Sequence, residues 1–399
     1  MFFALMLLFI PVSLVLQHVN APPAFIFVSA ALAIVPLAEY VRRGTEEVSN
    51  HLNPSIGSLL NVTFGNMPEL IIALFVLHHG GAEIVKAQIT GAIIGNGLLG
   101  LGMSVVVGTW GKEFETFSPR LAARLSSLLV LSMLALLVPA LFDLTERGIF
   151  GHANAGPQDE RLSIGVSIVL LLVYVANLVY TLVTHRSIYA RDKGEVEEKS
   201  STVWSLRKSF TVLVSASIGT AIESEILSQA LTPAAVSCGL SPLFLGLIVL
   251  AVIGNAAEYV SAVYYARKGQ FSQTLRITLG SSIQLALVVA PLLVLISPLL
   301  GHPMNLVFDN PLELIAIAAV AFAVTSIVQD GETMWLEGVL LIAVYALFVL
   351  AFLFANPKEN DAGHTARAHR NISVVAIPYD TAHSRVLQCS KILFSDRNS

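Results

Sequence analysis

Two apolar segments contain related polar stretches, Asn61-Val-Thr-Phe-Gly-Asn-Met-Pro-Glu69-Leu-Ile-Ile-Ala73 and Ile253-Gly-Asn-Ala-Ala-Glu258-Tyr-Val-Ser-Ala262. Both read Gly-Asn-x-x-Glu. The asparagine and the glutamate are three residues apart, so they share one face of a helix and set an amide beside a carboxylate. A carboxylate inside a membrane span is costly, which makes each glutamate a functional candidate.

A second match fixes the register of an internal repeat. Gly91 lies 22 residues beyond Glu69, and Gly280 lies 22 residues beyond Glu258. Each motif also occupies the same place within its half of the chain. The pattern therefore predicts a duplicated unit.

The composition indicates a membrane protein. Of 399 residues, 55% are apolar and 13% are charged, and the mean hydropathy is +0.74. One span needs about 20 apolar residues, so about 220 apolar residues suffice for about eleven spans. These values exclude a secreted disulfide scaffold and a disordered chain. A nucleic-acid-binding role is excluded because 23 Lys and Arg face 27 Asp and Glu.

We therefore predict an all-α polytopic membrane protein with about eleven transmembrane helices. Apolar runs place these helices near residues 1–17, 24–41, 54–77, 87–109, 121–143, 162–184, 207–230, 243–266, 277–300, 311–328 and 334–355. The first run lacks the positively charged start and the cleavage site of a secretory signal, so we expect it to remain as a helix.

An extra first helix and two halves of five helices account for this total. Because five is odd, the second half inserts in the opposite sense to the first, which predicts two inverted-topology repeats with a site near the midplane at their interface. The predicted parts are an extra helix at 1–20, a first repeat at 21–184, a cytoplasmic linker loop at 185–206, a second repeat at 207–355 and a disordered tail at 356–399.

The positions of Lys and Arg predict the orientation. With a cytoplasmic N-terminus, the cytoplasmic connections hold fourteen of these residues, the opposite connections three and the tail six. Cytoplasmic loops retain positive residues, so we expect the N-terminus in the cytoplasm. Arg42 and Arg43 are among the residues expected in a cytoplasmic loop.

Backbone chemistry at the first motif favours a cation. Pro68 cannot donate a hydrogen bond, which leaves the carbonyl of Phe64 without its helical partner. Gly65 and Gly254 are expected to loosen the corresponding turns of their helices. Freed carbonyls within a membrane occur where they face protein or a water-filled cavity, and there they can coordinate an ion.

Two carboxylates among amide and carbonyl oxygens suit a hard divalent cation such as Ca²⁺, which takes six to eight oxygen ligands. The scarcity of cysteine and the absence of a His-rich span argue against zinc or copper. When the cation leaves, two buried carboxylates cannot easily both stay charged, so protons replace it. Competition for one site that faces each side in turn predicts antiport.

At these residues the chain resembles the calcium/proton exchanger (CAX) family of the cation/calcium exchanger superfamily, over roughly residues 20–355. The stretches that carry the resemblance are Gly44–Glu47, Ser58–Ala73, Ile222–Leu227, Gly254–Val263 and Gly280–Ala286. The resemblance implies a bilayer-embedded secondary transporter, not an enzyme, that moves Ca²⁺ out of the cytosol against proton influx by alternating access. It implies no resident cofactor, and a homo-oligomer is possible.

The resemblance also implies roles for residues. Glu69 and Glu258 become the central cation ligands and proton acceptors. The residues implied to line or surround this site, or its access path, are Gly65, Asn66, Gly254, Asn255, Gln88, Gln284, Ser281, Ser282, Glu46, Glu223 and Glu225. An alternative role for the two glutamines is simple hydrogen bonding between helices.

Met67-Pro68 departs from the Ala, Val or Thr often found in this family and is closer to the sodium/calcium exchangers. Sodium-coupled or other cation exchange is therefore the alternative to proton coupling. An ion channel with paired carboxylates is less consistent with the inverted repeat. We expect a bacterial inner membrane location, with a vacuolar membrane as the alternative.

Overall fold

The computed structural model describes residues 2–148, 156–181, 204–308 and 310–355. The described residues up to Leu353 form one compact unit. Within the described residues, nine helices are long and apolar enough to cross a membrane, and two shorter apolar helices accompany them. The predicted linker, except for residues 204–206, and the predicted disordered tail lie outside the described residues.

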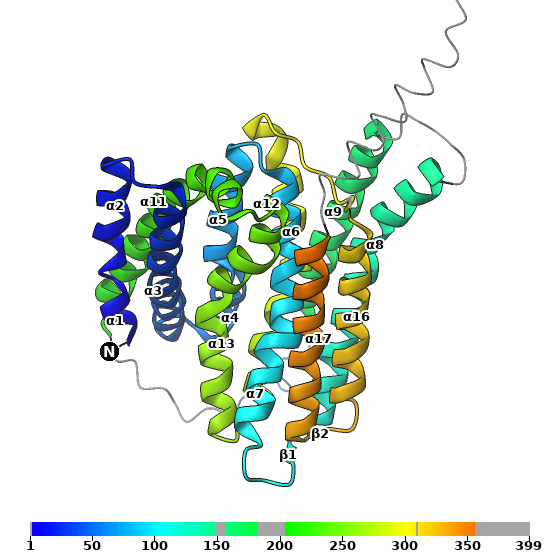
Figure 1. The fold of residues 1–399 in the computed structure, drawn as a ribbon. Helices are drawn as coiled ribbons and strands as arrows, with labels where there is room; N and C mark the ends of the chain where they lie inside the picture. The colour runs from blue at the N-terminus through cyan, green and yellow to red at the C-terminus, as the bar shows by residue number, and fades with distance from the viewer. Residues whose placement is uncertain (1, 149–155, 182–203, 309, 356–399) are drawn as a thin grey trace, which may run out of the picture. The chain divides into compact units, whose positions relative to one another are not determined.

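The elements follow the chain in the order seen in Figure 1. Those before the linker are α1 (Phe2–Met6), α2 (Phe9–His18), α3 (Pro23–Asn50), α4 (Pro54–Phe64), α5 (Met67–His78), α6 (Ala82–Ile94), the π-helix η1 (Gly95–Gly100), α7 (Leu101–Gly108), the strand β1 (Glu115–Thr116), α8 (Pro119–Gly148) and α9 (Gly156–Val179).

The second half repeats this helical character. Its elements are α11 (Leu206–Cys238), α12 (Pro242–Phe244), the π-helix η3 (Leu245–Leu250), α13 (Ala251–Arg267), α14 (Phe271–Gln284), the π-helix η4 (Leu285–Val289), α15 (Ala290–Ile296), the 3₁₀-helix η5 (Ser297–Leu300), α16 (Pro311–Val328), the strand β2 (Glu332–Thr333) and α17 (Trp335–Phe354).

The predicted third span is broken in two. Helix α4 ends at Phe64, Gly65 and Asn66 form a turn, and α5 begins at Met67. The break lies where Pro68 removes a backbone donor. The corresponding expectation for Gly254 is wrong, because α13 runs through it without interruption. Ala257 stands where the first motif has Pro68, so the backbone ladder of α13 keeps its donor.

Helix α3 extends well beyond its predicted end at residue 41 and reaches Asn50. Arg42 and Arg43, expected in a loop, are therefore helical. Ion pairs to Glu39 and Glu46 at helical spacing stabilise this polar stretch. Gly44 lets α11 approach closely, since a Cβ at this position would lie 2.9 Å from the Leu213 Cβ.

Connections predicted to lie on one membrane side meet at the same end of the bundle. Strands β1 and β2 pair antiparallel below α7 and α17 (Figure 1). The Phe117 N–H donates to the Gly331 carbonyl over 2.9 Å. Next to it, the Ser118 N–H donates to Ser272 Oγ over 3.3 Å.

At the opposite end of the bundle, hydrogen bonds join a second group of connections to neighbouring helices. Lys86 Nζ donates to the Val307 carbonyl over 2.5 Å, and the Leu306 N–H donates to Ser163 Oγ over 3.0 Å. Large apolar side chains on the outer faces of the long helices, such as Leu131, Leu172 and Phe322, are exposed. Such faces suit contact with lipid chains.

Candidate cation-binding site

Glu69 and Glu258 come from different halves of the chain, and Glu69 packs against α13, the helix that carries Glu258. Glu69 stands in the first turn of α5, directly after the helix break, and is 3% exposed. Its side chain packs on α13, where a Cβ added to Gly254 would lie 3.3 Å from Glu69 Cγ. Gly254 thus provides the space that Glu69 occupies.

The two motif asparagines make matching contacts with the opposite half. Asn66 Nδ2 donates to Gln284 Oε1 over 3.0 Å. Asn96 Nδ2 donates to Asn255 Oδ1, also over 3.0 Å. Gln284 ends α14 and Asn96 stands in η1, the π-helix that follows α6. In each half, the motif amide therefore binds an amide from the other half.

Ser281 joins these two contacts into one network. Its hydroxyl donates to Asn66 Oδ1 over 2.7 Å and accepts from Asn96 Nδ2 over 3.1 Å. Asn96 Nδ2 also lies 3.4 Å from Glu258 Oε2. Gln88 Nε2 donates to the backbone carbonyl of Glu69 over 3.3 Å, which fixes the first turn of α5.

Asn96 is the functional candidate that the sequence analysis missed. It is fully buried, and it belongs to one of the three Gly-Asn dipeptides in the chain, the other two being at residues 65–66 and 254–255. A search for Gly-Asn within apolar runs would have found it. Its place in a π-helix fits the frequent occurrence of such turns at functional sites.

Three acceptor oxygens around this network lack a hydrogen-bond partner among the described residues. They are Glu69 Oε2, Gln88 Oε1 and Asn96 Oδ1, and all three are buried. Buried polar atoms are normally paired, so unpaired oxygens need an explanation such as an ion or water that binds there. The described residues contain no cluster of three His, Cys, Asp or Glu. A cation here would therefore use amide, hydroxyl, backbone or water oxygens besides the two carboxylates.

Some predicted residues lie at the margin of the network. The Ser282 hydroxyl donates to the Thr278 carbonyl of its own helix over 3.1 Å and does not join the network. Gly65 lies beside the network, since a Cβ at position 65 would be 3.3 Å from Gln284 Oε1. Phe64 ends α4, and its side chain lines an apolar cavity of about 350 Å³ against α3 and α11.

The three other acidic residues predicted for the site lie outside the network and form contacts with other residues. Glu46 accepts from Arg42 Nη1 over 3.1 Å within α3. Glu223 is fully buried and accepts from Ser13 Oγ of α2 over 2.8 Å. Glu225 accepts from Gln229 Nε2 over 2.5 Å and lies 3.5 Å from His79 Nε2.

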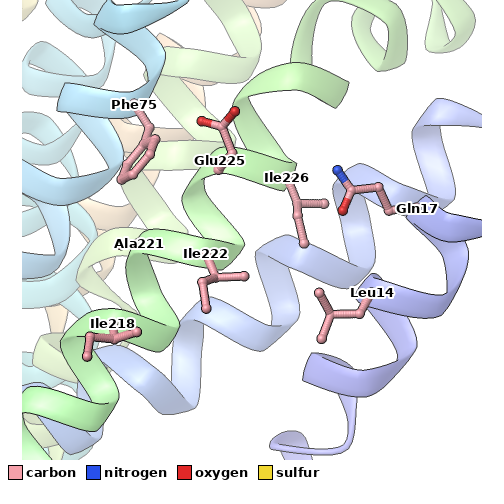
Figure 2. Close-up of a pocket in the computed structure, with 8 residues that line it drawn as sticks. All are labelled: Leu14, Gln17, Phe75, Ile218, Ala221, Ile222, Glu225 and Ile226. Atoms are coloured by element: carbon pink, nitrogen blue, oxygen red, sulfur yellow. The ribbon is translucent and has the colours of Figure 1, made fainter.

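Glu225 lines a cavity of about 380 Å³ between α2, α5 and α11. Figure 2 shows its carboxylate above the apolar side chains of Ile218 and Ile222, with Leu14 and Gln17 of α2 on the other side. The lining is mostly apolar. Glu225 is thus a half-exposed carboxylate at the edge of an apolar space.

Comparison with known proteins assigns a family. Residues 22–183 and 208–354 match the model of the sodium/calcium exchanger protein family. The chain is 39% identical over 370 residues to the Ca²⁺/H⁺ antiporter of Synechocystis sp., covering 88% of this chain and 97% of that protein. It is 35% identical over 354 residues to the vacuolar calcium ion transporter of Schizosaccharomyces pombe, covering 88% and 85%.

A solved structure extends the likeness to the fold. The structure of native YfkE superposes with a TM-score of 0.75 at 34% identity, covering 88% of this chain and 99% of the other. The prediction of an all-α polytopic membrane protein with about eleven transmembrane helices is confirmed as an all-helical membrane fold of about nine to eleven helical spans. The chain belongs to the calcium/proton antiporter (CAX) family within the sodium/calcium exchanger superfamily, a family of membrane transporters and not of enzymes.

Proposed function

We propose that the protein exchanges cytosolic Ca²⁺ for protons at a site built around Glu69 and Glu258. The observation that carries this proposal is the set of unpaired buried oxygens beside the two carboxylates. The Ca²⁺/H⁺ antiporter activity named for the Synechocystis relative supports the choice of substrates.

The site can hold Ca²⁺ with the oxygens that it offers. Glu69 and Glu258 supply the negative charge, and the free acceptors of Gln88 and Asn96 supply neutral oxygens. Such hard oxygen ligands match Ca²⁺, whose coordination is flexible and often completed by water. When Ca²⁺ leaves, protons bind the carboxylates, because two adjacent buried negative charges repel each other.

The exchange requires that the site opens to each side in turn. We propose that residues 21–184 and 207–355 move against each other as inverted repeats, with the cross-half amide network at their interface. The contacts Asn66–Gln284 and Asn96–Asn255 support this division, because each joins one half to the other. We also propose a cytoplasmic N-terminus and a bacterial inner membrane location.

The test is proton flux in proteoliposomes that contain the purified full chain. Addition of Ca²⁺ should dissipate an imposed proton gradient, and external Mg²⁺ serves as a divalent control. Glu69→Gln and Glu258→Gln should each abolish the flux, since neither amide can carry the charge that Ca²⁺ and protons neutralise. Glu225→Gln is the matched control on a carboxylate outside the network. Intact exchange in both central variants would refute the proposal.

A second set of measurements distinguishes proton coupling from sodium coupling. Ca²⁺ uptake is measured with a proton gradient and no sodium, and then with a sodium gradient at equal pH on both sides. Proton coupling predicts uptake only in the first case. Uptake only in the second case would show that the same site exchanges Ca²⁺ for Na⁺.

A further inference from the structure

Tyr259 follows Glu258 on α13 and packs against η1, the π-helix that carries Asn96. Its side chain is buried. A Cβ added to Gly95 would overlap the phenol oxygen of Tyr259 and lie 3.5 Å from its Cζ. A Cβ added to Gly100 would lie 2.8 Å from Cδ1 and 3.0 Å from Cε1 of the same ring. The ring therefore rests on both ends of η1, at two residues that have no side chain.

The spacing of these two glycines fits the geometry of η1. Gly95 and Gly100 are five residues apart, which is the hydrogen-bond spacing of a π-helix. The Leu101 N–H accordingly donates to the Asn96 carbonyl, five residues earlier. An α-helix pairs residues that are four apart. A change of η1 to the α register would therefore shift residue 96 by one position relative to α7.

The contacts of Asn96 depend on this register. Its Nδ2 reaches Asn255 Oδ1, the Ser281 hydroxyl and Glu258 Oε2, so residue 96 has to face α13 and α14. Asn255 and Tyr259 are four residues apart on α13 and share one face of that helix. The tyrosine ring and the amide partner of Asn96 thus contact η1 from the same side.

Steric fit explains Tyr259 better than hydrogen bonding does. Its hydroxyl is buried and has no hydrogen-bond partner among the described residues. The ring, in contrast, fills the space above Gly95 and Gly100. Such close packing transmits a displacement from one element to its neighbour.

We propose that Tyr259 is a positioning residue whose ring holds η1 in the π register and so keeps Asn96 directed at the central site. This inference rests on the proposed function, because its effect is measured as Ca²⁺ affinity. Tyr259 needs no contact with the cation itself. Residues that orient metal ligands from outside the first coordination shell commonly change metal affinity by about 10- to 100-fold.

The experiment measures Ca²⁺ binding to the purified full chain by calorimetry. Gly95→Ala places a methyl group against the Tyr259 hydroxyl, and the ring can swing aside only by leaving Gly100. We therefore expect roughly tenfold weaker Ca²⁺ binding. Tyr259→Phe keeps the ring and should bind Ca²⁺ like the wild type. In the double variant the alanine Cβ would meet ring Cζ at 3.5 Å, an ordinary contact, so Tyr259→Phe should restore the affinity that Gly95→Ala loses.

Gly100→Ala is the matched control for this rescue. Its Cβ would meet Cδ1 and Cε1, which phenylalanine retains. Gly100→Ala should also weaken Ca²⁺ binding, and Tyr259→Phe should not restore it. Tyr259→Ala removes the ring without adding a methyl group, and it should weaken binding roughly tenfold as well.

A second comparison tests whether Tyr259 acts through Asn96. In an Asn96→Ala background, Tyr259→Ala should cause no further loss of Ca²⁺ affinity, because residues that act through one contact are not additive. Phe352→Ala removes a buried ring from α17. This variant should lower the unfolding temperature and leave Ca²⁺ affinity unchanged, which separates positioning from general stability. If Gly95→Ala is not recovered, Tyr259→Ala carries the test.

Three results would overturn the inference. They are a wild-type Ca²⁺ affinity in Tyr259→Ala, an unrescued loss in the Gly95→Ala and Tyr259→Phe double variant, and additive losses from Tyr259→Ala and Asn96→Ala. Failure of the proposed function is a separate result, since the wild type would then bind no Ca²⁺. The unfolding temperatures would still report whether Tyr259→Phe compensates for Gly95→Ala.

Discussion

The side chain of Glu69 packs directly against Gly254, so that a Cβ at position 254 would stand 3.3 Å from Glu69 Cγ. This distance is tighter than ordinary contact, and an alanine would push the carboxylate by a few tenths of an ångström. The two residues belong to the two copies of the Gly-Asn-x-x-Glu motif. The glycine of one motif thus determines where the glutamate of the other can lie.

Gly254→Ala should therefore impair transport more than stability. We expect the ratio of the maximal exchange rate to the half-saturating Ca²⁺ concentration to fall roughly tenfold, because small misplacements of a reacting group are costly. Proteoliposome flux measures the effect, and thermal unfolding in detergent measures stability. Gly280→Ala is the matched control, since its added Cβ would meet nothing within 4 Å. Equal losses in both variants would contradict this explanation.

Asn96→Ala should affect both stability and transport. In the wild type, Asn96 Nδ2 donates to both Asn255 Oδ1 and the Ser281 hydroxyl. The variant removes this donor from both acceptors. Leaving buried polar atoms unpaired costs about 1–3 kcal/mol. Thermal unfolding should show this loss, and Ca²⁺ affinity should fall with it.

Ser282→Ala is the control for the Asn96 variant. Its hydroxyl binds only a carbonyl of its own helix among the described contacts, so stability and Ca²⁺ affinity should stay near the wild type. A wild-type Ca²⁺ affinity in Asn96→Ala would show that this amide does not take part in the site.

Much of the fold and part of the site could be predicted from the sequence. The apolar runs located the helices because a bilayer requires long apolar stretches. The central glutamates stood out because a charge within a span is costly. Asn96 carries no charge, so the same search passed over it, and its contacts with the second half arise only when the halves pack together.

Local exceptions to these patterns required the structure. Arg42 and Arg43 indicated a loop because they are charged, yet neighbouring glutamates hold them within α3. Gly254 suggested a loosened turn, but the flexibility of a glycine is not enough to break a helix whose backbone donors are all present. Pro68 in the first motif removes such a donor, and there the helix does break.

Gly91→Ala should prevent correct packing between the halves. A Cβ at Gly91 would lie 1.7 Å from the Leu247 carbonyl oxygen and 2.9 Å from the Ala251 Cβ. Helices α6 and η3 would have to separate, so we expect a loss of about 3 kcal/mol or more. Size-exclusion chromatography and thermal unfolding measure it. Gly165→Ala, which meets nothing within 4 Å, should behave like the wild type, and a stable Gly91→Ala protein would refute the close contact.

Lys86→Met should loosen the connection between α15 and α16. Lys86 is 4% exposed, and its ammonium group binds the Val307 carbonyl over 2.5 Å and Glu83 over 2.7 Å. A hydrogen bond to a charged group contributes about 1.5–3 kcal/mol, so thermal stability should fall by about that amount. Lys112 forms an ion pair with Glu115, also three residues away in the sequence, but its side chain is 46% exposed. Lys112→Met should therefore change stability by less than about 1 kcal/mol, and an equal loss in both variants would show that the buried carbonyl contact contributes little.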